Sequence, residues 1–404
     1  MQEIQSHLLQ NYTQHPAFQF GSKTWDLDEK LIEKFNHLYL TIKEVALSVS
    51  KSSTQKLQNK CFITLEEIFS SLLVQTEDKY ENYFLEELQL ECKRLLNEEF
   101  DWYKRPQRTD FAKIDNEEVL QNSVLLGSNR YFFSQLSSNA VSQIMETASQ
   151  DIVKLRENAE AGRLKREDLS INTGRAVRAI RRILNKEFKR LGVLDNVGAY
   201  TGHKTKVTGL ALELSVPQAT WWQNAIHGLN RPPHTLYAHI DESIAFPKSI
   251  VYLTNVDENN GPTSCYPKAY EAMQLNPLQE IVGRVIGIVG SQAGSPLKAY
   301  YSKQYHQSVN SDNFRKHFML LPVNMRFNSH MGWDVKPESE LENNLVKLEN
   351  KMIGPAGSFI IFDGAKLFHR GGLLQKGERI ALQVIFSDLT LMQRICIRLK
   401  RIFS

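Results

Sequence analysis

Cysteine is scarce in this chain, and its few cysteines are widely spaced. The 404 residues contain four of them, Cys61, Cys92, Cys265 and Cys396, and no two form a C-x-x-C pair. Neither a zinc knuckle nor a disulfide framework is therefore indicated. Thiols without a paired spacing are typical of a reducing compartment, so we expect a cytoplasmic protein.

Long hydrophobic runs are also missing. No stretch approaches the roughly eighteen consecutive apolar residues that a membrane-spanning helix needs. The segment Met1–His7 does not combine a basic start with an apolar run, so we expect no secretory signal. The chain is long enough for a large core and two domains, and its hydrophobic content of 42% is ordinary for a folded soluble protein.

Acidic side chains are absent from residues 391–404, which contain Arg394, Arg398, Lys400 and Arg401. These cations equal the formal net charge of +4 of the whole chain. Apolar residues recur there at three- and four-residue spacing, which predicts a basic amphipathic C-terminal tail. Such a tail either lies on an anionic membrane surface or packs on the protein with its cations in water, and the sequence leaves both open.

Proline is rare in residues 1–165, where only Pro16 and Pro106 occur. Phe84–Leu96 and Asn139–Glu157 combine good helix formers with apolar residues at helical spacing. We therefore predict that residues 1–165 form a mainly helical N-terminal region, which shields or extends a catalytic domain.

From about residue 205 the pattern changes to short runs of β-branched and aromatic residues between turn signals. The runs expected to be strands are Lys206–Leu214, Thr235–Asp241, Lys248–Val256, Ile281–Val289, Lys316–Val323, Ser358–Phe362 and Arg379–Phe386. Runs of this kind suit a double-sheet jelly roll, or double-stranded β-helix. The expected fold class is α+β, with a jelly-roll catalytic domain over residues 166–390.

The triplet His239-Ile240-Asp241 closes one of the predicted strands. Residues i and i+2 of a strand point to the same face, so the imidazole and the carboxylate converge while Ile240 turns away. Two imidazoles and one carboxylate on one face of a ferrous ion leave positions open for a co-substrate and O₂. His239 and Asp241 therefore qualify as two of the three ligands of a non-haem iron site.

The third ligand is expected from a strand that returns beside the first. Ser358–Phe362 is a short apolar strand, and His369 follows it after a turn. Arg379 then opens the last predicted strand, and its planar guanidinium suits a two-point contact with a carboxylate. Each feature alone is weak, because an H-x-D triplet arises easily by chance in a chain with 11 histidines. Their order, strand context and spacing together favour one site.

Residues 200–388 resemble the Fe(II)- and 2-oxoglutarate-dependent dioxygenases, and specifically the phytanoyl-CoA dioxygenase-like branch. The resemblance rests on the H-x-D triplet, on the strand and turn Ile250–Pro262, on Gly357–Gly372 and on Arg379. It does not extend into the N-terminal third of the chain.

This resemblance implies a catalytic iron centre of His239, Asp241 and His369, with Arg379 holding the far carboxylate of 2-oxoglutarate. Relatives often carry a hydroxyl group two residues after the distal histidine. This chain has Gly371 there, so the second contact to that carboxylate is unassigned.

The implied reaction is the hydroxylation of a C–H bond of a small-molecule, lipid-type or sugar-type metabolite, with release of succinate and CO₂. Its cofactors would be Fe(II), 2-oxoglutarate as co-substrate, and O₂. Desaturation and ring closure stay open, whereas Asp241 disfavours halogenation because no small residue leaves room for a halide. Two alternatives remain: a non-catalytic jelly-roll binding or scaffold protein, and a membrane-surface enzyme that modifies envelope or lipid precursors.

Loops on a rigid barrel usually set specificity, so substrate contacts are expected among Trp221, Trp222, Tyr301 and Trp333. Residues 173–190 are expected to form an amphipathic helix whose basic face is either solvated or docks an anionic substrate. Nucleic acid is disfavoured as a partner because no recognised binding module accompanies the charge. The sequence does not define an oligomeric state.

Overall fold

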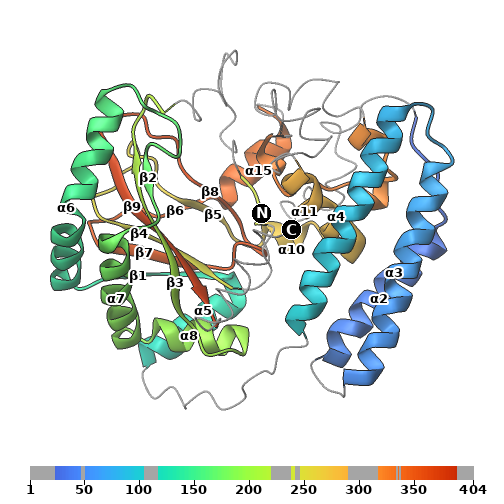
Figure 1. The fold of residues 1–404 in the computed structure, drawn as a ribbon, viewed down its shortest axis with the longest axis horizontal. Helices are drawn as coiled ribbons and strands as arrows, with labels where there is room; N and C mark the ends of the chain where they lie inside the picture. The colour runs from blue at the N-terminus through green and yellow to red at the C-terminus, as the bar shows by residue number, and fades with distance from the viewer. Residues whose placement is uncertain are drawn as a thin grey trace.

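The computed structural model describes residues 23–46, 51–103, 117–219, 238–241, 246–289, 317–333, 335 and 338–388. Within them the chain forms a six-stranded sheet, a three-stranded sheet and helices, and every strand pairing is antiparallel. Figure 1 shows the sheets with their helices on one side and a bundle of long helices on the other. We call these parts the sheet lobe and the helical lobe. The expected α+β class is confirmed as a mixed fold with antiparallel sheets.

The six-stranded sheet has the strand order β1-β7-β4-β9-β3-β2. Its strands are β1 (Tyr131–Gln135), β2 (Ser170–Ile171), β3 (Lys206–Ser215), β4 (Lys248–Tyr252), β7 (Ser358–Phe362) and β9 (Arg379–Ser387). Strand β9 lies between β3 and β4 and pairs with both. Arg379, the first residue of β9, lies opposite Ser215, the last residue of β3.

One face of this sheet packs against helices. Side chains of β9 alternate between the two faces, and Ile380, Leu382, Val384 and Phe386 are buried on the helical face. The helices on this face are α5 (Glu117–Asn129), α6 (Ser138–Glu160), α7 (Arg175–Arg190) and α8 (Val193–Thr201). Helix α7 buries the apolar stripe that its spacing predicts: Val177, Ile180, Leu184 and Phe188.

The other face of the large sheet meets a three-stranded sheet with the order β6-β5-β8. Its strands are β5 (Ser264–Tyr266), β6 (Asn350–Lys351) and β8 (Phe368–Arg370). Ile360 and Phe362 of β7 share a buried cluster with Cys265 of β5 and with Leu367. This cluster joins the two sheets.

The helical lobe is built on one apolar core. Its elements are α2 (Glu29–Ala46), α3 (Lys51–Leu73), α4 (Lys79–Tyr103), α10 (Ala269–Ala272), α11 (Pro277–Val289), α15 (Glu340–Leu348) and the 3-10 turns η3 (Val323–Met325) and η4 (Met331–Trp333). Ile240 and Phe368, which flank the metal-ligand candidates in sequence, belong to the same core. Among the described residues no helix is both long and apolar enough to cross a bilayer.

The prediction of a strand over Ile281–Val289 is wrong, because these residues belong to helix α11. Asn276 and Gln279 form a reciprocal capping box, in which the side-chain oxygen of each accepts from the other's backbone N–H at 3.0 and 3.1 Å. Pro277 occupies the first helical position, where proline is favoured. The buried residues recur at helical spacing: Leu278, Ile281, Val282 and Val285. The helix cap and the helical spacing of the apolar residues therefore outweigh the strand preference of the β-branched residues.

The prediction of a strand over Lys316–Val323 is also wrong. Residues 317–320 are helical, and η3 follows them. The buried side chain of Arg326 donates to the carbonyl oxygen of Leu321 at 2.6 Å and to that of Met319. A side chain thus satisfies the backbone oxygens that a strand ladder would have used.

Two further predicted strands are shorter than expected. The run Lys248–Val256 ends as a regular strand at Tyr252, and Val256 makes only an isolated bridge to Gly354. Of Thr235–Asp241 the structure describes residues 238–241, where His239 bridges His369.

Strand β1 lies inside the N-terminal region that was expected to be mainly helical. It pairs with β7 along its whole length, from Tyr131 opposite Phe362 to Gln135 opposite Ser358. Residues 117–160 therefore pack with the sheet lobe, while α2, α3 and α4 form the helical lobe. A domain boundary near residue 165 stays a prediction.

Replacing Leu382 of β9 with alanine is expected to lower the free energy of unfolding by about 2–5 kcal/mol, because this side chain is fully buried beneath the helices. Ile385 on the same strand is 49% exposed and is the matched control. The Ile385→Ala change is expected to cost under about 1 kcal/mol. Urea unfolding followed by circular dichroism measures both variants. Equal losses would contradict the assignment of the two faces of β9.

Candidate metal centre

Two histidines and one aspartate from distant parts of the chain meet in space. His239, Asp241 and His369 each offer one ligand atom, and these atoms lie within 4.8 Å of one another. Asp241 Oδ1 lies 3.8 Å from Nε2 of His239 and 3.8 Å from Nε2 of His369. The three side chains can therefore hold a metal ion through two nitrogen atoms and one oxygen atom.

Backbone hydrogen bonds bring the three residues together. His239 and His369 exchange both hydrogen bonds of an antiparallel bridge, each with 3.0 Å between nitrogen and oxygen. The Asp241 N–H donates to the Gly364 carbonyl oxygen at 2.7 Å. Ile240, between the two ligands, is fully buried in the helical-lobe core. The alternation expected of an extended H-x-D segment thus sends both polar side chains to the same side.

His369 has a defined tautomer. Its Nδ1–H donates to the Leu367 carbonyl oxygen at 2.9 Å, which leaves Nε2 without a proton on the side of Asp241. Burial, together with the neighbouring His239, lowers the pKa of His369 to about 3. The imidazole is therefore neutral near pH 7, which is the state that binds metals.

Asp241 is a buried carboxylate in a positively charged setting. Its side chain is 9% exposed, and Lys248 Nζ lies 2.6 Å from Oδ1. Burial alone would raise the pKa of Asp241, but His369, Lys248 and His239 lower it well below its ordinary range. Oδ2 is buried and has no hydrogen-bond partner. An unpartnered carboxylate oxygen is costly to bury, and a bound cation would relieve that cost.

Gly364 leaves open the space that the Asp241 carboxylate occupies. A Cβ atom at position 364 would lie 1.8 Å from Asp241 Oδ2 and 3.3 Å from Cε1 of His369. The φ of Gly364 is not positive, so the backbone conformation does not demand glycine. Close packing against the aspartate is therefore the reason for glycine here.

Arg379 is a buried cation at the start of β9. It is 8% exposed, its Nη2 donates to Ser215 Oγ at 3.1 Å, and its Nη1 donates to the Gly261 carbonyl oxygen. Its Nε has no hydrogen-bond partner. Burial lowers the pKa of Arg379, but an arginine still stays protonated.

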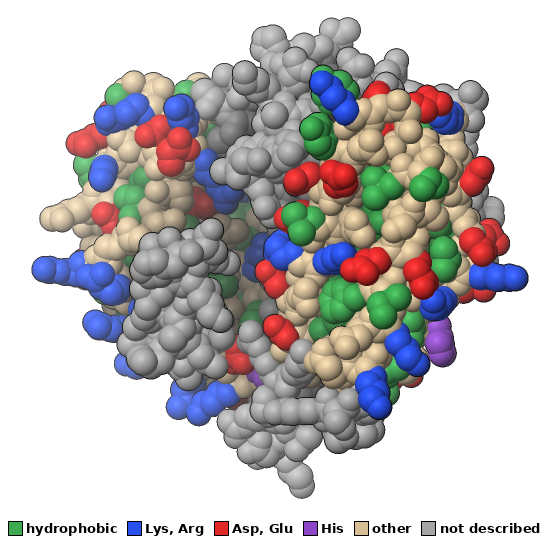
Figure 2. Space-filling model, turned by 45° about the vertical axis from the view of Figure 1, so that its right-hand side comes forward, with side chains coloured by type: hydrophobic (Ala, Val, Ile, Leu, Met, Phe, Trp, Pro, Cys, Tyr) green, Lys and Arg blue, Asp and Glu red, His purple; other side chains and the backbone are tan. Residues whose placement is uncertain are grey.

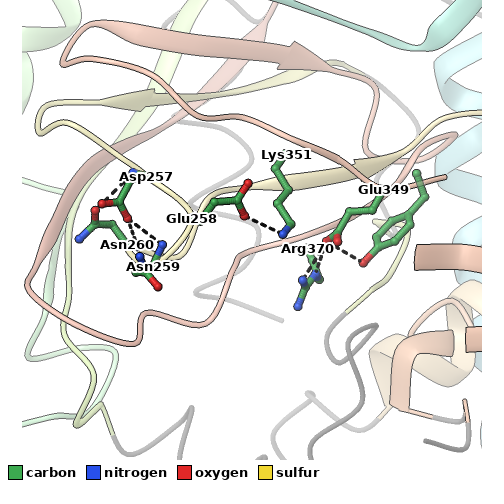
Figure 3. A network of polar contacts seen from close by, with 8 residues as sticks. Asp257, Glu258, Asn259, Asn260, Glu349, Lys351 and Arg370 are labelled. Atoms are coloured by element: carbon green, nitrogen blue, oxygen red, sulfur yellow. Dashed lines mark hydrogen bonds and ion pairs between the residues drawn. The ribbon is translucent and has the colours of Figure 1, made fainter. Parts of the chain in front are cut away.

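A polar turn positions the carbonyl group that Arg379 contacts. Asp257 Oδ1 accepts from the N–H of Asn259 at 2.7 Å and from that of Asn260 at 3.2 Å (Figure 3). The Asn260 side chain donates to a carbonyl oxygen of the loop before β9 at 3.1 Å. The predicted turn therefore fixes Gly261 next to the first residue of β9.

A buried ion pair holds the strand that carries His369. Arg370 donates to Glu349 Oε1 from Nε at 3.0 Å and from Nη2 at 2.8 Å, and the Tyr266 hydroxyl donates to the same oxygen at 3.3 Å (Figure 3). The side chains of Arg370 and Glu349 are 11% and 7% exposed. Burial would raise the pKa of Glu349, but Arg370 lowers it. Because Arg370 follows His369, the pair fixes β8 in place.

All four predicted polar residues line one cavity of about 580 Å³: His239, Asp241, His369 and Arg379. Sequence reasoning did not assign several other polar residues of its wall to the site, among them Ser215, Lys248, Thr263 and Gln383. Strand alternation could have identified Gln383, because it lies four residues after Arg379 on β9. His330 lies outside the regular strands, and its ring stacks on that of His239 with 5.0 Å between centroids.

The predicted substrate contacts are not described in the same detail. Trp221, Trp222 and Tyr301 lie outside the described residues. Trp333 ends η4, but only its backbone position is described. The basic tail over residues 391–404 also lies outside the described residues.

Comparisons with known proteins leave the family open. No protein-family model and no curated protein matches the chain. Among solved structures, AviO1 from Streptomyces viridochromogenes Tue57 is 11% identical, with 69% of this chain and 96% of that chain covered and a TM-score of 0.36. EctD from S. alaskensis, solved with 2-oxoglutarate and 5-hydroxyectoine, is 11% identical, with 70% and 82% covered and a TM-score of 0.37.

A third similar structure is SnoK from nogalamycin biosynthesis, described as a non-heme alpha ketoglutarate dependent carbocyclase. It is 11% identical, with 70% of this chain and 88% of that chain covered and a TM-score of 0.35. Likenesses this distant do not assign an activity, so any functional assignment depends on the residues of this chain.

Changing Arg370 to methionine is expected to lower the free energy of unfolding near pH 7 by about 3–5 kcal/mol, because it leaves the buried Glu349 carboxylate uncompensated. The wild-type pair stabilises the fold above the ordinary pKa of Glu349, and this contribution disappears as the pH falls through the lowered pKa. The difference between variant and wild type should therefore narrow in acid. Lys34→Met is the control, because its ion pair with Glu67 is exposed and should contribute under about 1 kcal/mol. Denaturant titrations at several pH values measure these differences, and a pH-independent loss would count against the ion pair.

Changing Gly364 to alanine is expected to abolish or strongly weaken metal binding, because the new Cβ would overlap Asp241 Oδ2. Gly127→Ala is the control, since a Cβ there meets nothing within 4 Å. Titration with Co(II), followed by its visible absorption, compares the two variants. Wild-type Co(II) affinity in the Gly364 variant would remove Asp241 from the metal site.

Proposed function

We propose that the chain is an Fe(II)- and 2-oxoglutarate-dependent oxygenase of the phytanoyl-CoA dioxygenase-like type, which hydroxylates a C–H bond of a small-molecule metabolite. The observation that carries the proposal is the convergence of two imidazoles, one carboxylate and a buried guanidinium on one cavity. This combination is uncommon in an ordinary packed core, because each of these groups is costly to bury without a partner.

The donor set suits ferrous iron. Two imidazole nitrogens and one carboxylate oxygen form the ligand set typical of non-haem iron oxygenases that keep positions open. The buried and unpartnered Oδ2 of Asp241 supports a cation in this place. His239, Asp241 and His369 would hold the metal.

The surroundings of Arg379 suit the distal carboxylate of 2-oxoglutarate. Its guanidinium is buried, lines the cavity and keeps an unpartnered Nε. The Ser215 hydroxyl lies 3.1 Å from Nη2, so it is our candidate for the second carboxylate contact that Gly371 cannot supply. When bound, iron and 2-oxoglutarate would supply the oxidation, with O₂ as the oxidant and succinate and CO₂ as products.

The protein itself orients the ligand side chains and limits the access of water to the site. The Leu367 carbonyl group keeps a proton on His369 Nδ1, so that Nε2 faces the metal site. Lys248 holds Asp241 ionised and in place. Ile250, Phe362 and Ala381 add apolar surface to the cavity wall, which limits the water around bound groups.

The two facing antiparallel sheets, with the site beside their shared cluster, support a jelly-roll catalytic domain. A cytoplasmic location remains part of the proposal. It is supported by the free, buried thiols of Cys61, Cys92 and Cys265.

Anaerobic addition of Fe(II) and then 2-oxoglutarate is expected to produce the weak visible charge-transfer band of the chelate. The Arg379→Ala variant should still bind Fe(II). Its affinity for 2-oxoglutarate should fall by about tenfold to a hundredfold, because the change removes a charged hydrogen-bonding partner. Asp241→Ala should lose Fe(II). Arg166→Ala is the matched control, since Arg166 lines the same cavity but its side chain is 73% exposed.

Admission of O₂ and a host metabolite extract should then release succinate in the wild-type protein. A chelate band without any substrate-dependent succinate would favour a non-catalytic binding protein. Absence of the band, or an Arg379→Ala variant with unchanged 2-oxoglutarate affinity, would contradict the proposed site.

A further inference from the structure

Helix α7 presents a continuous basic face to solvent. Its exposed cations recur at spacings of three and four residues, which places them on one side of the helix. These cations are Arg175, Arg178, Arg182, Lys186 and Lys189. The buried apolar stripe of α7 lies on the opposite side of the helix. From first to last the cations extend over about 21 Å, at a rise of about 1.5 Å per residue.

The acidic content of α7 does not offset the charge of this face. The only acid of the helix is Glu187, which is buried and pairs with Arg190 at 2.8 Å. Within the part of the chain that the structure describes, none of the five cations of the face lies within 4.0 Å of a carboxylate. In contrast, Lys34 of helix α2 lies 2.7 Å from Glu67. The face of α7 therefore carries charge of one sign.

Neighbouring cations destabilise a helix. Each cation of this face has another cation three or four residues away, and like charges at these spacings repel each other. Helix α4 avoids this repulsion by mixing both signs, because its Arg94 lies 2.7 Å from Glu91 and 2.7 Å from Glu98. An anionic partner would remove the repulsion on α7. A helix with one apolar and one basic face is typical of segments that bind such a partner.

The basic face lies at the outer edge of the sheet lobe, away from the cavities. Neither the cavity at the candidate metal centre nor a second cavity of about 600 Å³ between the two lobes is lined by a residue of α7. Figure 2 shows basic side chains gathered at the lower left edge of the molecule, which is the side where α7 lies in Figure 1. Small molecules bind in concave sites, so a partner for this face is an extended anionic surface.

Two observations favour a lipid surface over a nucleic acid. The only aromatic residue of α7, Phe188, is buried, so the face offers no ring on which an unpaired base could stack. The helix packs against α6, α8 and β3, so it lies along the surface and does not project as a helix that enters the major groove must. Clusters of Lys and Arg on an amphipathic helix are typical of segments that contact anionic lipid headgroups.

The C-terminal tail begins close to the same helix. Strand β9 ends at Ser387, opposite Lys206 of β3, and the next residue, Val207, exchanges hydrogen bonds of 2.9 and 3.1 Å with the Asn185 side chain of α7. Residues 391–404 carry four further cations and no acid. The chain beyond β9 can extend up to about 50 Å, so it can reach the surface on which α7 lies. A basic amphipathic segment and a polybasic patch together supply the two signals that stable peripheral binding requires.

We propose that the exposed face of α7 binds the protein to an anionic lipid bilayer, with the basic tail as a second contact on the same surface. The five cations of the face contact negatively charged headgroups. The cytoplasmic leaflet is the anionic one, so this binding agrees with the cytoplasmic location proposed above. The inference does not depend on iron or 2-oxoglutarate.

Sedimentation of the full-length protein with lipid vesicles tests the proposal. Wild-type protein should bind vesicles that contain phosphatidylglycerol, should not bind pure phosphatidylcholine vesicles, and should dissociate as salt is added. The triple change Arg178→Gln, Arg182→Gln and Lys186→Gln should weaken binding by about fivefold for each charge, or about a hundredfold in total. These positions are exposed and glutamine is a good helix former, so the variant should keep its fold.

The matched control removes the same number of exposed charges from the helical lobe, through Lys30→Gln, Lys56→Gln and Lys60→Gln. This control should bind vesicles about as tightly as wild type, because its charges lie far from the proposed surface. A triple change in the tail, Arg398→Gln, Lys400→Gln and Arg401→Gln, should weaken binding but leave a part that still depends on α7.

Several outcomes would overturn the proposal. They are wild-type protein that binds neither kind of vesicle or both equally, an α7 variant that binds as tightly as wild type, and a control that loses as much affinity as the α7 variant. Fluorescence anisotropy at the same salt concentration tests a short DNA duplex and a single-stranded RNA. Tighter binding of either one than of the vesicles, lost in the α7 variant, would show that the face binds nucleic acid instead.

Discussion

The central constraint on this structure is the need to keep the Asp241 carboxylate buried and ionised. A carboxylate away from water is stable only when positive charge or hydrogen-bond donors surround it. Lys248 supplies a full charge at 2.6 Å, while Oδ2 stays without any partner. The fold therefore carries a local cost at this point, which extensive apolar burial in both lobes offsets. Such a cost is typical of a site kept for a ligand and not for stability.

Both lobes are needed to hold that carboxylate and its two imidazoles. Ile240 and Phe368 lie in the core of the helical lobe, while their sequence neighbours Asp241 and His369 face the cavity. The polar face of each short extended segment is thus set by the burial of its apolar face. The N-terminal helices share this apolar core, whereas the ring contacts of Phe368 are with Tyr270 and Phe327 of the same lobe.

The turn after β7 connects the two cavities. Gly364 must lack a side chain to make room for Asp241, and its neighbours Asp363 and Lys366 face the opposite cavity. A short, tightly packed turn cannot move on one side without moving on the other, because protein interiors yield little to small displacements.

The sequence by itself determined the features that depend on local periodicity and turn chemistry. These are the two-residue spacing of His239 and Asp241, the apolar stripe of α7, and the strand that begins at Arg379. Only the tertiary structure decided that Lys248 meets Asp241, that position 364 has no room for a Cβ, that β1 joins the sheet, and that two lobes enclose a second cavity. The first group follows from steric and hydrogen-bonding preferences of neighbouring residues. The second depends on distances between segments far apart in the chain, which no local preference sets.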